Sequence, residues 1–444
     1  MSEDFFSTPR VFIRYGIARK QSLLKDVRRA FDGIVLPGNV LLYQYNSTPS
    51  VIMNCNLPYF VDPMSYLFGQ PYEDFKRRTK KGNRYKPSFI KLLKGHGLSD
   101  NHLRLQHSEL MKLLLDDPQI MHSFVENALN FQQSSVYESL KTNREMISPQ
   151  NLPRLDDGSL YPTFYVPPYF LFSTGNNGHG TATDLNRAII EYCWGNREHW
   201  SPIFPLAFVH KRQLESTIAL DSIISDLKNH DFPGYCVWID DFDEKRATEP
   251  QIAGFIRLIK SLAFPNSRVV IMHAGYFSLV LHQFGVSGIC HGLAYGEALS
   301  ATAAARRGSG GPPIRYYLKD LHHFLTLPDA LLVLRKRPDL ICTCPICMRI
   351  VRGDAENVIR FENEEALAEM HFLFNRDIEK RDVAKKSIRD LLNYLTISEM
   401  LYNDIGELKK EVKINEKYQE RSIIDPQYLN RWITAITNAL PAET

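Results

Sequence analysis

The sequence lacks the features that mark membrane and secreted proteins. It contains no run of about 18 apolar residues, the length that a membrane-spanning helix requires. The first ten residues have no apolar core of a secretion signal. The total of seven cysteines is odd and partly clustered, which indicates a reducing compartment rather than a disulfide framework. We therefore expect a cytoplasmic protein with no membrane partner.

Two further absences narrow the range of functions that the sequence supports. Neither a Gly-x-Gly-x-x-Gly fingerprint nor a P-loop is present, so nucleotide-cofactor folds gain no support. The formal net charge is only +3 over 444 residues, so bulk charge predicts no partner and any basic surface must be local. The length suggests one large domain with attachments, or two to three domains.

Three cysteines and a histidine form the clearest motif. Cys342, Cys344 and Cys347 lie close together, and His371 follows within 364–375, which predicts a helix. Thiolate and imidazole are ligands that zinc prefers, and four protein ligands leave no position open for water. We expect one structural Zn²⁺ per chain; buried free thiols and a catalytic zinc are the weaker alternatives.

Short apolar runs alternate with helical segments after Pro168. Runs of this length between helices of ten or more residues are typical of parallel strands buried on both faces. With two or three more such runs near the N-terminus, they predict an α/β fold, a (βα)8 TIM-like barrel. An open doubly wound sheet is the alternative. The runs after Pro168 lie at 169–173, 203–210, 235–240, 268–273 and 286–291.

The same pattern suggests how the chain is divided. We expect the barrel to span 1–297, with a helical insertion around 99–143. The Gly- and Pro-rich start of 298–341 predicts a linker or loop segment. Residues 342–444 would form a zinc-binding subdomain with a helical tail. In the first half, the apolar run Val51–Cys55 predicts a short buried strand.

Polar side chains follow several of the predicted strands. In a barrel these positions meet at the carboxyl-terminal face, where active sites form. Paired carboxylates in a low-dielectric cleft separate their pKa values, so that one serves as an acid and the other as a nucleophile. The candidate catalytic residues are Asp62, Asp240 and Asp241, and side-chain alternation lets only one of the last two point inward. The candidate substrate-binding residues are Tyr59, Phe60, His273, His291, Tyr295 and Glu297.

One segment is densely basic. Clustered lysine and arginine displace condensed counterions from nucleic acid, and nearby aromatic rings can stack on bases. We expect this segment to contact nucleic acid, with a solvated loop as the alternative. Its basic residues are Lys76, Arg77, Arg78, Lys80, Lys81, Arg84 and Lys86.

The cysteine cluster and its distant histidine, placed after a parallel α/β region, resemble the tRNA-guanine transglycosylase family. The segments 324–328 and 272–275, the second followed by Gly285-Val286, are similar to neighbouring parts of that family. The resemblance implies a zinc-bearing (βα)8 barrel that replaces guanine in nucleic acid with a 7-deazaguanine base. The family's separate RNA-binding C-terminal domain is not evident, so the likeness is closest to the branch that modifies DNA rather than tRNA.

The sequence departs from the family at the reaction centre. Where the family has its nucleophilic aspartate, the last predicted strand ends in Cys290 and His291. The resemblance therefore leaves a carboxylate nucleophile to Asp240 or Asp241, with Asp62 as general acid and base.

Two alternatives stay open. The chain could be a non-catalytic nucleic-acid-binding or partner subunit of a modification system. It could also be a nucleobase-releasing glycosidase or a hydrolase, in one version with a metal held by His210, His273, His291 and an aspartate.

Overall fold

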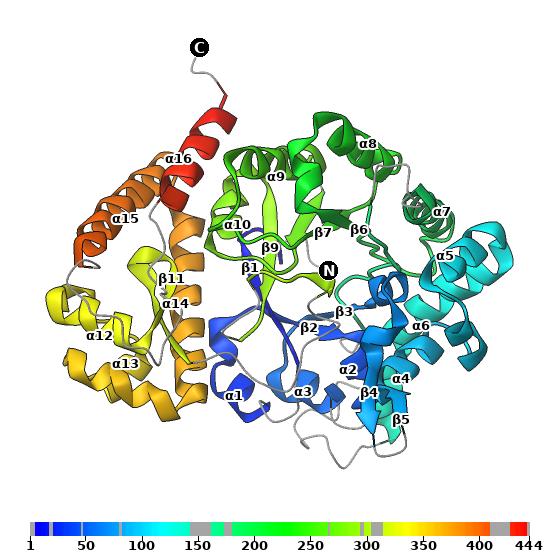
Figure 1. The fold of residues 1–444 in the computed structure, drawn as a ribbon, viewed down its shortest axis with the longest axis horizontal. Helices are drawn as coiled ribbons and strands as arrows, with labels where there is room; N and C mark the ends of the chain where they lie inside the picture. The colour runs from blue at the N-terminus through cyan, green and yellow to red at the C-terminus, as the bar shows by residue number, and fades with distance from the viewer. Residues whose placement is uncertain are drawn as a thin grey trace.

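The computed structural model describes most of the chain (Figure 1). The described residues are 5–16, 21–45, 48–79, 82–142, 161–172, 180–264, 267–293, 297–302, 314–408 and 427–441.

Seven parallel strands form a curled half-barrel (Figure 1). Their order is β3-β2-β1-β9-β8-β7-β6, so the first strand lies beside the last. Nearly every strand residue is buried, and burial of both faces explains why these runs are continuously apolar instead of alternating. The strands are β1 (Arg10–Arg14), β2 (Gly33–Pro37), β3 (Tyr59–Asp62), β6 (Leu206–His210), β7 (Gly234–Asp240), β8 (Arg268–Ile271) and β9 (Val286–His291).

Residues 161–172 contact both edge strands of this sheet. The Thr163 amide donates to the Tyr59 carbonyl of β3 at 2.7 Å, and the Phe172 amide donates to the Phe208 carbonyl of β6 at 2.8 Å. The segment contains Pro162, Pro167 and Pro168, which have no N–H for a regular ladder. The strand predicted at 169–173 is accordingly reduced, within the described residues, to an isolated bridge at Phe172.

Helices cover the outside of the half-barrel (Figure 1). After β3 the chain forms an antiparallel hairpin and three helices. This stretch includes the region around 99–143, where the sequence predicts a helical insertion. Val51–Cys55 belongs to a helix, so its prediction as a strand is wrong; a short apolar run does not distinguish a buried helix from a buried strand. The first-half elements are α1 (Gln21–Asp26), α2 (Gly38–Tyr43), α3 (Thr48–Cys55), β4 (Lys76–Thr79), β5 (Gly82–Tyr85), α4 (Pro87–Gly95), α5 (His107–Asp116) and α6 (Pro118–Thr142).

The second half continues with helices between strands and then a largely helical C-terminal part. Residues 314–341, expected to belong to a linker, instead form a hairpin and a helix, and the Thr326 hydroxyl caps that helix at the Asp329 amide. The elements are α7 (Gly180–Gly195), α8 (Thr217–Lys228), α9 (Glu249–Leu262), α10 (Tyr276–Val280), β10 (Arg315–Leu318), β11 (His323–Thr326), α12 (Leu327–Lys336), α13 (Pro345–Ile350), α14 (Glu365–Lys385), α15 (Ile388–Leu408) and α16 (Gln427–Ala439).

The helix α14 joins the C-terminal part to the sheet. It packs against β1 and α10 (Figure 1), and Lys380 on this helix contacts both carboxylate oxygens of Asp32 at 3.0 and 2.9 Å. Segments far apart in the sequence therefore share one core. Of the helices in the described part of the chain, none is both long and apolar enough to cross a membrane.

Candidate functional site

Cys342, Cys344, Cys347 and His371 converge on one point. Their ligand atoms all lie within 4.8 Å of one another, and three of the four residues are buried. The three thiols come from the turn that leads into α13, where backbone amides donate to Cys342 Sγ at 3.3 Å and to Cys344 Sγ at 3.4 Å. His371 comes from α14. This group could hold a metal ion such as zinc.

Hydrogen bonds orient the histidine of this centre. His371 Nε2 lies 2.8 Å from the Tyr317 carbonyl, and a carbonyl only accepts, so Nε2 carries the proton. Nδ1 then presents its lone pair to the thiols, 3.2 Å from Cys347 Sγ. The Tyr316 ring stacks on the imidazole with centroids 4.4 Å apart. Such surroundings fix the tautomer that a metal ligand needs.

A second polar centre lies at the carboxyl ends of β1 and β3. Arg14 ends β1 and pairs with Asp62, which ends β3, at 2.8 Å. The Asp62 carboxylate also accepts from the Tyr169 hydroxyl at 2.7 Å and from the Met64 amide at 2.9 Å. The Asp62 side chain is fully buried. Only donors appear in these contacts, so the carboxylate is held as a hydrogen-bond acceptor.

Aromatic side chains form a wall beside Asp62. Tyr66 stacks on Tyr169 with centroids 5.8 Å apart and meets Trp238 of β7 edge-on at 4.7 Å. Trp238 in turn lies 5.0 Å from the His273 ring. The Tyr66 hydroxyl and the Trp238 indole N–H are buried and have no hydrogen-bond partner among the described residues. Buried polar groups are nearly always paired, so these two atoms mark a place for a polar ligand or water.

Asp240, which ends β7, and Asp241, which follows it, face different surroundings. Asp240 is 7% exposed and accepts from the Ala301 amide at 2.7 Å; burial raises its pKa. The Asp241 side chain is 54% exposed and pairs with Lys211 at 2.6 Å. Its left-handed backbone, with φ of 55°, turns it away from the strand. Asp241 lines a separate pocket of about 290 Å³ with Arg246.

The Tyr66 hydroxyl lies in a buried and negatively charged environment. Burial raises the pKa of Tyr66, and the negative charges of Asp62 and Asp240 raise it further. Two of the three candidate catalytic residues, which end two different strands, thus contribute to the raised pKa of Tyr66.

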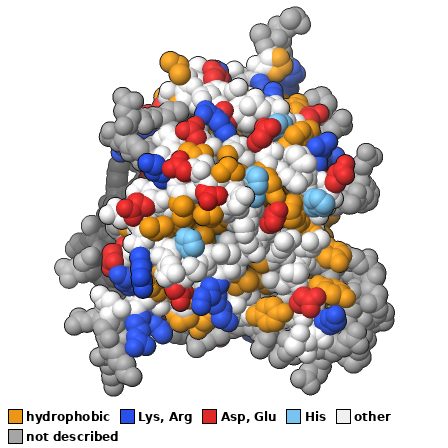
Figure 2. All heavy atoms as spheres, turned by 90° about the vertical axis from the view of Figure 1, so that its right-hand side faces the viewer, with side chains coloured by type: hydrophobic (Ala, Val, Ile, Leu, Met, Phe, Trp, Pro, Cys, Tyr) orange, Lys and Arg blue, Asp and Glu red, His pale blue; other side chains and the backbone are white. Residues whose placement is uncertain are grey.

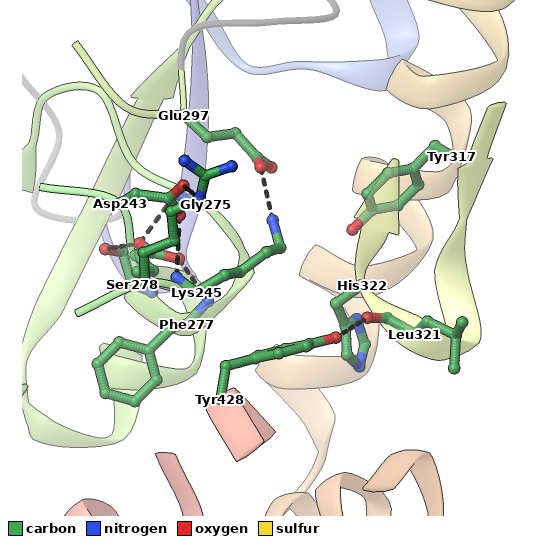
Figure 3. Close-up of polar contacts among 12 residues, drawn as sticks. Asp243, Lys245, Gly275, Phe277, Ser278, Glu297, Tyr317, Leu321, His322 and Tyr428 are labelled. Atoms are coloured by element: carbon green, nitrogen blue, oxygen red, sulfur yellow. Dashed lines mark hydrogen bonds and ion pairs between the residues drawn. The ribbon is translucent and has the colours of Figure 1, made fainter. Parts of the chain in front are cut away.

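A chain of ion pairs links the segment after β9 to α14, and Figure 3 shows its pair of Glu297 with Lys245. Glu297, in the segment after β9, pairs with Lys245 at 3.0 Å and with Arg376 of α14. Arg376 also pairs with Glu379 at 2.9 Å, and Glu379 lies 2.7 Å from His322 Nδ1. Although burial favours the neutral acid, Lys245 and Arg376 lower the pKa of Glu297. The helix that carries His371 therefore also holds Glu297, a predicted substrate-binding residue.

Sequence reasoning missed several residues of this region. Glu244 is buried and accepts from the amides of Gly275, Phe277 and Ser278 at 2.9 to 3.1 Å (Figure 3), so it ties the loop after β7 to the start of α10. In the sequence, the sign of its role was an acidic residue close to the strand-end aspartates Asp240 and Asp241. Arg14 was also missed, although it is the cation that ends an apolar strand.

Other predicted residues lie elsewhere. Phe60 packs in the core, stacked on Phe164 with centroids 4.4 Å apart, and its neighbour Tyr59 is buried as well. His291 is buried against Phe372 of α14, and burial lowers its pKa to about 4. Tyr295 lies outside the described residues.

The histidines proposed for a second metal do not form a ligand group. Apart from the Cys₃His cluster, the described residues include no set of three or more His, Cys, Asp or Glu ligands close enough to share an ion. His210 ends β6, where its Nδ1 accepts from the Arg212 amide at 3.2 Å.

The basic segment forms the β4–β5 hairpin. Arg77 and Arg84 are paired across it, and both are exposed. Lys76 pairs with Glu73 and lies over the Tyr85 ring. Figure 2 shows lysine and arginine side chains gathered low on this face, at the level where Figure 1 draws β4 and β5. Of the remaining predicted residues, the described side chains include Lys86 but not Arg78, Lys80 or Lys81.

The chain was compared with known proteins in three ways. No protein-family model, no curated protein and no solved structure matches it. The case for a function therefore rests on the geometry of its own residues.

Proposed function

We propose that this chain is a base-exchange enzyme that replaces guanine in DNA with a 7-deazaguanine base. One observation carries the proposal: the Asp62 carboxylate accepts from the Tyr169 hydroxyl beside Tyr66 and Trp238, whose hydroxyl and indole N–H are buried and have no hydrogen-bond partner among the described residues. A purine is flat and has polar edges, so aromatic walls with free donors suit it. The target nucleotide must leave the base stack to reach such a buried place.

The surroundings of the two carboxylates suggest their roles. The contacts of Asp62 with Arg14, Met64 and Tyr169 all come from donors, which suits a carboxylate nucleophile. Burial raises the pKa of Asp240, which suits a general acid. This assignment exchanges the roles that the family resemblance implies.

The exchange has two steps, the release of guanine and the attachment of the new base. An Asp62 oxygen forms a bond to the sugar C1′ while the bond from C1′ to guanine N9 breaks, and Asp240 protonates the leaving purine. The incoming base then gives a proton to Asp240 and bonds to C1′ as the bond to Asp62 breaks. Tyr66 and Trp238 would hold either base in place by contact with its face and edge.

The finer architecture belongs to the same proposal. Residues 161–172 would act as an irregular strand that completes a (βα)8 barrel, which is supported by their hydrogen bonds to both edge strands. The metal would be one structural zinc ion per chain, because four protein ligands leave no position for a substrate. When bound, it would supply no reaction chemistry and would hold α13 against α14.

The test is incorporation of a labelled 7-deazaguanine base by the purified chain. With guanine-containing DNA, the wild type should incorporate label, whereas Asp62→Asn and Asp240→Asn should reduce incorporation by about 10²-fold or more. Asp241→Asn is the matched control and should stay within a few-fold of the wild type. Equal activity of all three variants would remove the assignment, and a preference for tRNA would remove the choice of DNA.

A partner-subunit role is the second candidate, favoured by the exposed Arg77 and Arg84 of the β4–β5 hairpin. It predicts that the purified chain binds nucleic acid but incorporates no label until a catalytic protein is added.

A further inference from the structure

A groove between α2 and α4 combines exposed aromatic surface with two lysines. Its volume is about 560 Å³, and its lining includes Tyr43, Tyr45, Lys91 and Lys94. The Tyr43 ring is 49% exposed, an unusual position for a large aromatic side chain. Lys91 Nζ lies 5.7 Å from the centre of that ring. The groove thus offers a stacking surface with positive charge beside it.

The two lysines are presented by the amphipathic helix α4. Its buried face carries Phe89, Leu92 and Leu93, so Lys91 and Lys94 lie on the opposite, solvent side. Lys94 is 3.7 Å from Asp100, but both side chains are mostly exposed, and such a pair is weak. Lys91 has no carboxylate partner among the described residues. Both cations are therefore available to an anion in solution.

The groove and the β4–β5 hairpin form one unit. Phe75, which directly precedes the hairpin, stacks on Phe89 of α4 with centroids 4.3 Å apart and planes 9° from parallel. The Lys86 amide also donates to the Phe75 carbonyl at 2.8 Å. The exposed Arg77 of the hairpin and the lysines of α4 are thereby fixed relative to one another.

The groove also lies near the candidate reaction centre. The helix α2 begins at Gly38, where a Cβ atom would lie only 3.2 Å from the Asp62 carbonyl oxygen, so the first residue of α2 touches the end of β3. From Gly38 to Tyr43 a helix rises about 8 Å. The groove therefore begins within a few turns of helix from the strand end that carries Asp62.

We propose that the α2–α4 groove binds single-stranded DNA next to the target nucleotide. A neighbouring base stacks on Tyr43, and its phosphates lie against Lys91 and Lys94. The inference rests on the proposed function. Extrusion of one nucleotide leaves the bases next to it without a stacking partner, and the Tyr43 ring takes the place of that partner. An acidic peptide would match the lysines but has no base to place on the ring.

The test is the binding of a fluorescein-labelled, guanine-containing DNA single strand, followed by fluorescence anisotropy over a range of salt concentrations. Lys91→Glu with Lys94→Glu should weaken binding about tenfold or more and reduce the slope of log K against log salt by about 1.4, or about 0.7 for each phosphate contact. Tyr43→Ala should weaken binding about tenfold, whereas Tyr43→Phe should bind as the wild type does.

The matched control reverses two exposed lysines elsewhere, Lys112→Glu on α5 with Lys385→Glu on α14. It changes the net charge equally and should weaken binding less than threefold. If both double variants lose affinity equally, or if Tyr43→Ala binds normally, the groove is not the binding site. Tighter binding of RNA of the same sequence, or of an acidic peptide, would also overturn the proposal.

Failure of this inference is separable from failure of the proposed function. The binding measurements are repeated in the Asp240→Asn background, where no exchange is expected. Groove variants that weaken binding there support the groove even if the wild type never incorporates a base. Normal binding by the groove variants, together with base exchange by the wild type, rejects the groove alone.

Discussion

The Tyr169 hydroxyl donates a 2.7 Å hydrogen bond to Asp62 across 107 positions of sequence. Tyr169 belongs to the segment that contacts both edge strands of the half-barrel, and Asp62 ends one of those strands. The same contact thus ties the segment 161–172 to the sheet and supplies a donor to the proposed nucleophile. The position of the candidate reaction centre therefore depends on how this segment packs against the sheet.

Replacement of Asp240 should abolish activity without a loss of stability. Because burial raises the pKa of Asp240, its ionisation opposes folding, and this cost grows as the pH rises through the pKa of the folded state. Asp240→Asn removes the ionisation and should unfold at a temperature no lower than the wild type at pH 8, while base exchange is lost. Thermal unfolding at pH 8 and pH 4 checks this, and the advantage of the variant should shrink at pH 4.

Removal of the metal should destabilise the C-terminal part. Cys344→Ser takes one ligand from the cluster and should lose the bound metal, which costs several kcal/mol of unfolding free energy. The matched control, Cys55→Ala, changes a buried cysteine outside the cluster and should retain one ion per chain. Metal analysis and thermal unfolding are the measurements; a full complement of zinc in Cys344→Ser would contradict the ligand assignment.

His96 should make the protein less stable in acid. It lies among Phe68, Phe124 and Phe131, and burial lowers its pKa to about 4 from 6.5. Between pH 4 and pH 6.5, His96 is therefore protonated in the unfolded chain and neutral in the folded chain. Stability from this residue is complete above pH 6.5 and falls toward pH 4 by about 1.4 kcal/mol per pH unit.

The measurement for His96 is urea unfolding at pH 7 and pH 5. The variant His96→Phe keeps an aromatic ring and should lose less stability between these pH values than the wild type. The loss should not vanish, since burial lowers the pKa of His291 in the same way. An unchanged pH dependence in His96→Phe would show that this histidine is not the source.

Arg376 should be the least replaceable cation of α14. Its fully buried side chain pairs with Glu297 and Glu379. Arg376→Met leaves Glu297 with Lys245 alone and Glu379 without its arginine, and it should cost about 3–5 kcal/mol. The matched control on the same helix is Arg381→Met. Arg381 is 59% exposed in its pair with Asp377, and its loss should cost at most about 1 kcal/mol. Similar losses in urea unfolding would show that the buried network contributes little.

Features encoded by neighbouring residues could be predicted from the sequence. The cysteine cluster and the helix that carries His371 depend on short spacing and helical periodicity, and the parallel strands depend on apolar runs. The alternation of a strand indicated that Asp240 and Asp241 face different ways. It did not indicate which one faces inward, because that depends on the left-handed backbone of Asp241.

Contacts between distant residues could not be predicted in this way. Neither the pairing of Arg14 with Asp62 nor the three amides that bind Glu244 has a periodic signal in the sequence. The short run Val51–Cys55 was assigned to the wrong element because its apolar residues fit a buried helix as well as a strand.

The position of α14 has a consequence for synthesis of the chain. Because α14 packs on β1, β1 stays uncovered on that side until residues 365–385 have left the ribosome. A nascent chain that ends after β9 would expose apolar surface along the seam between its first and last strands. The sheet therefore gains this cover only after most of the polypeptide has been made.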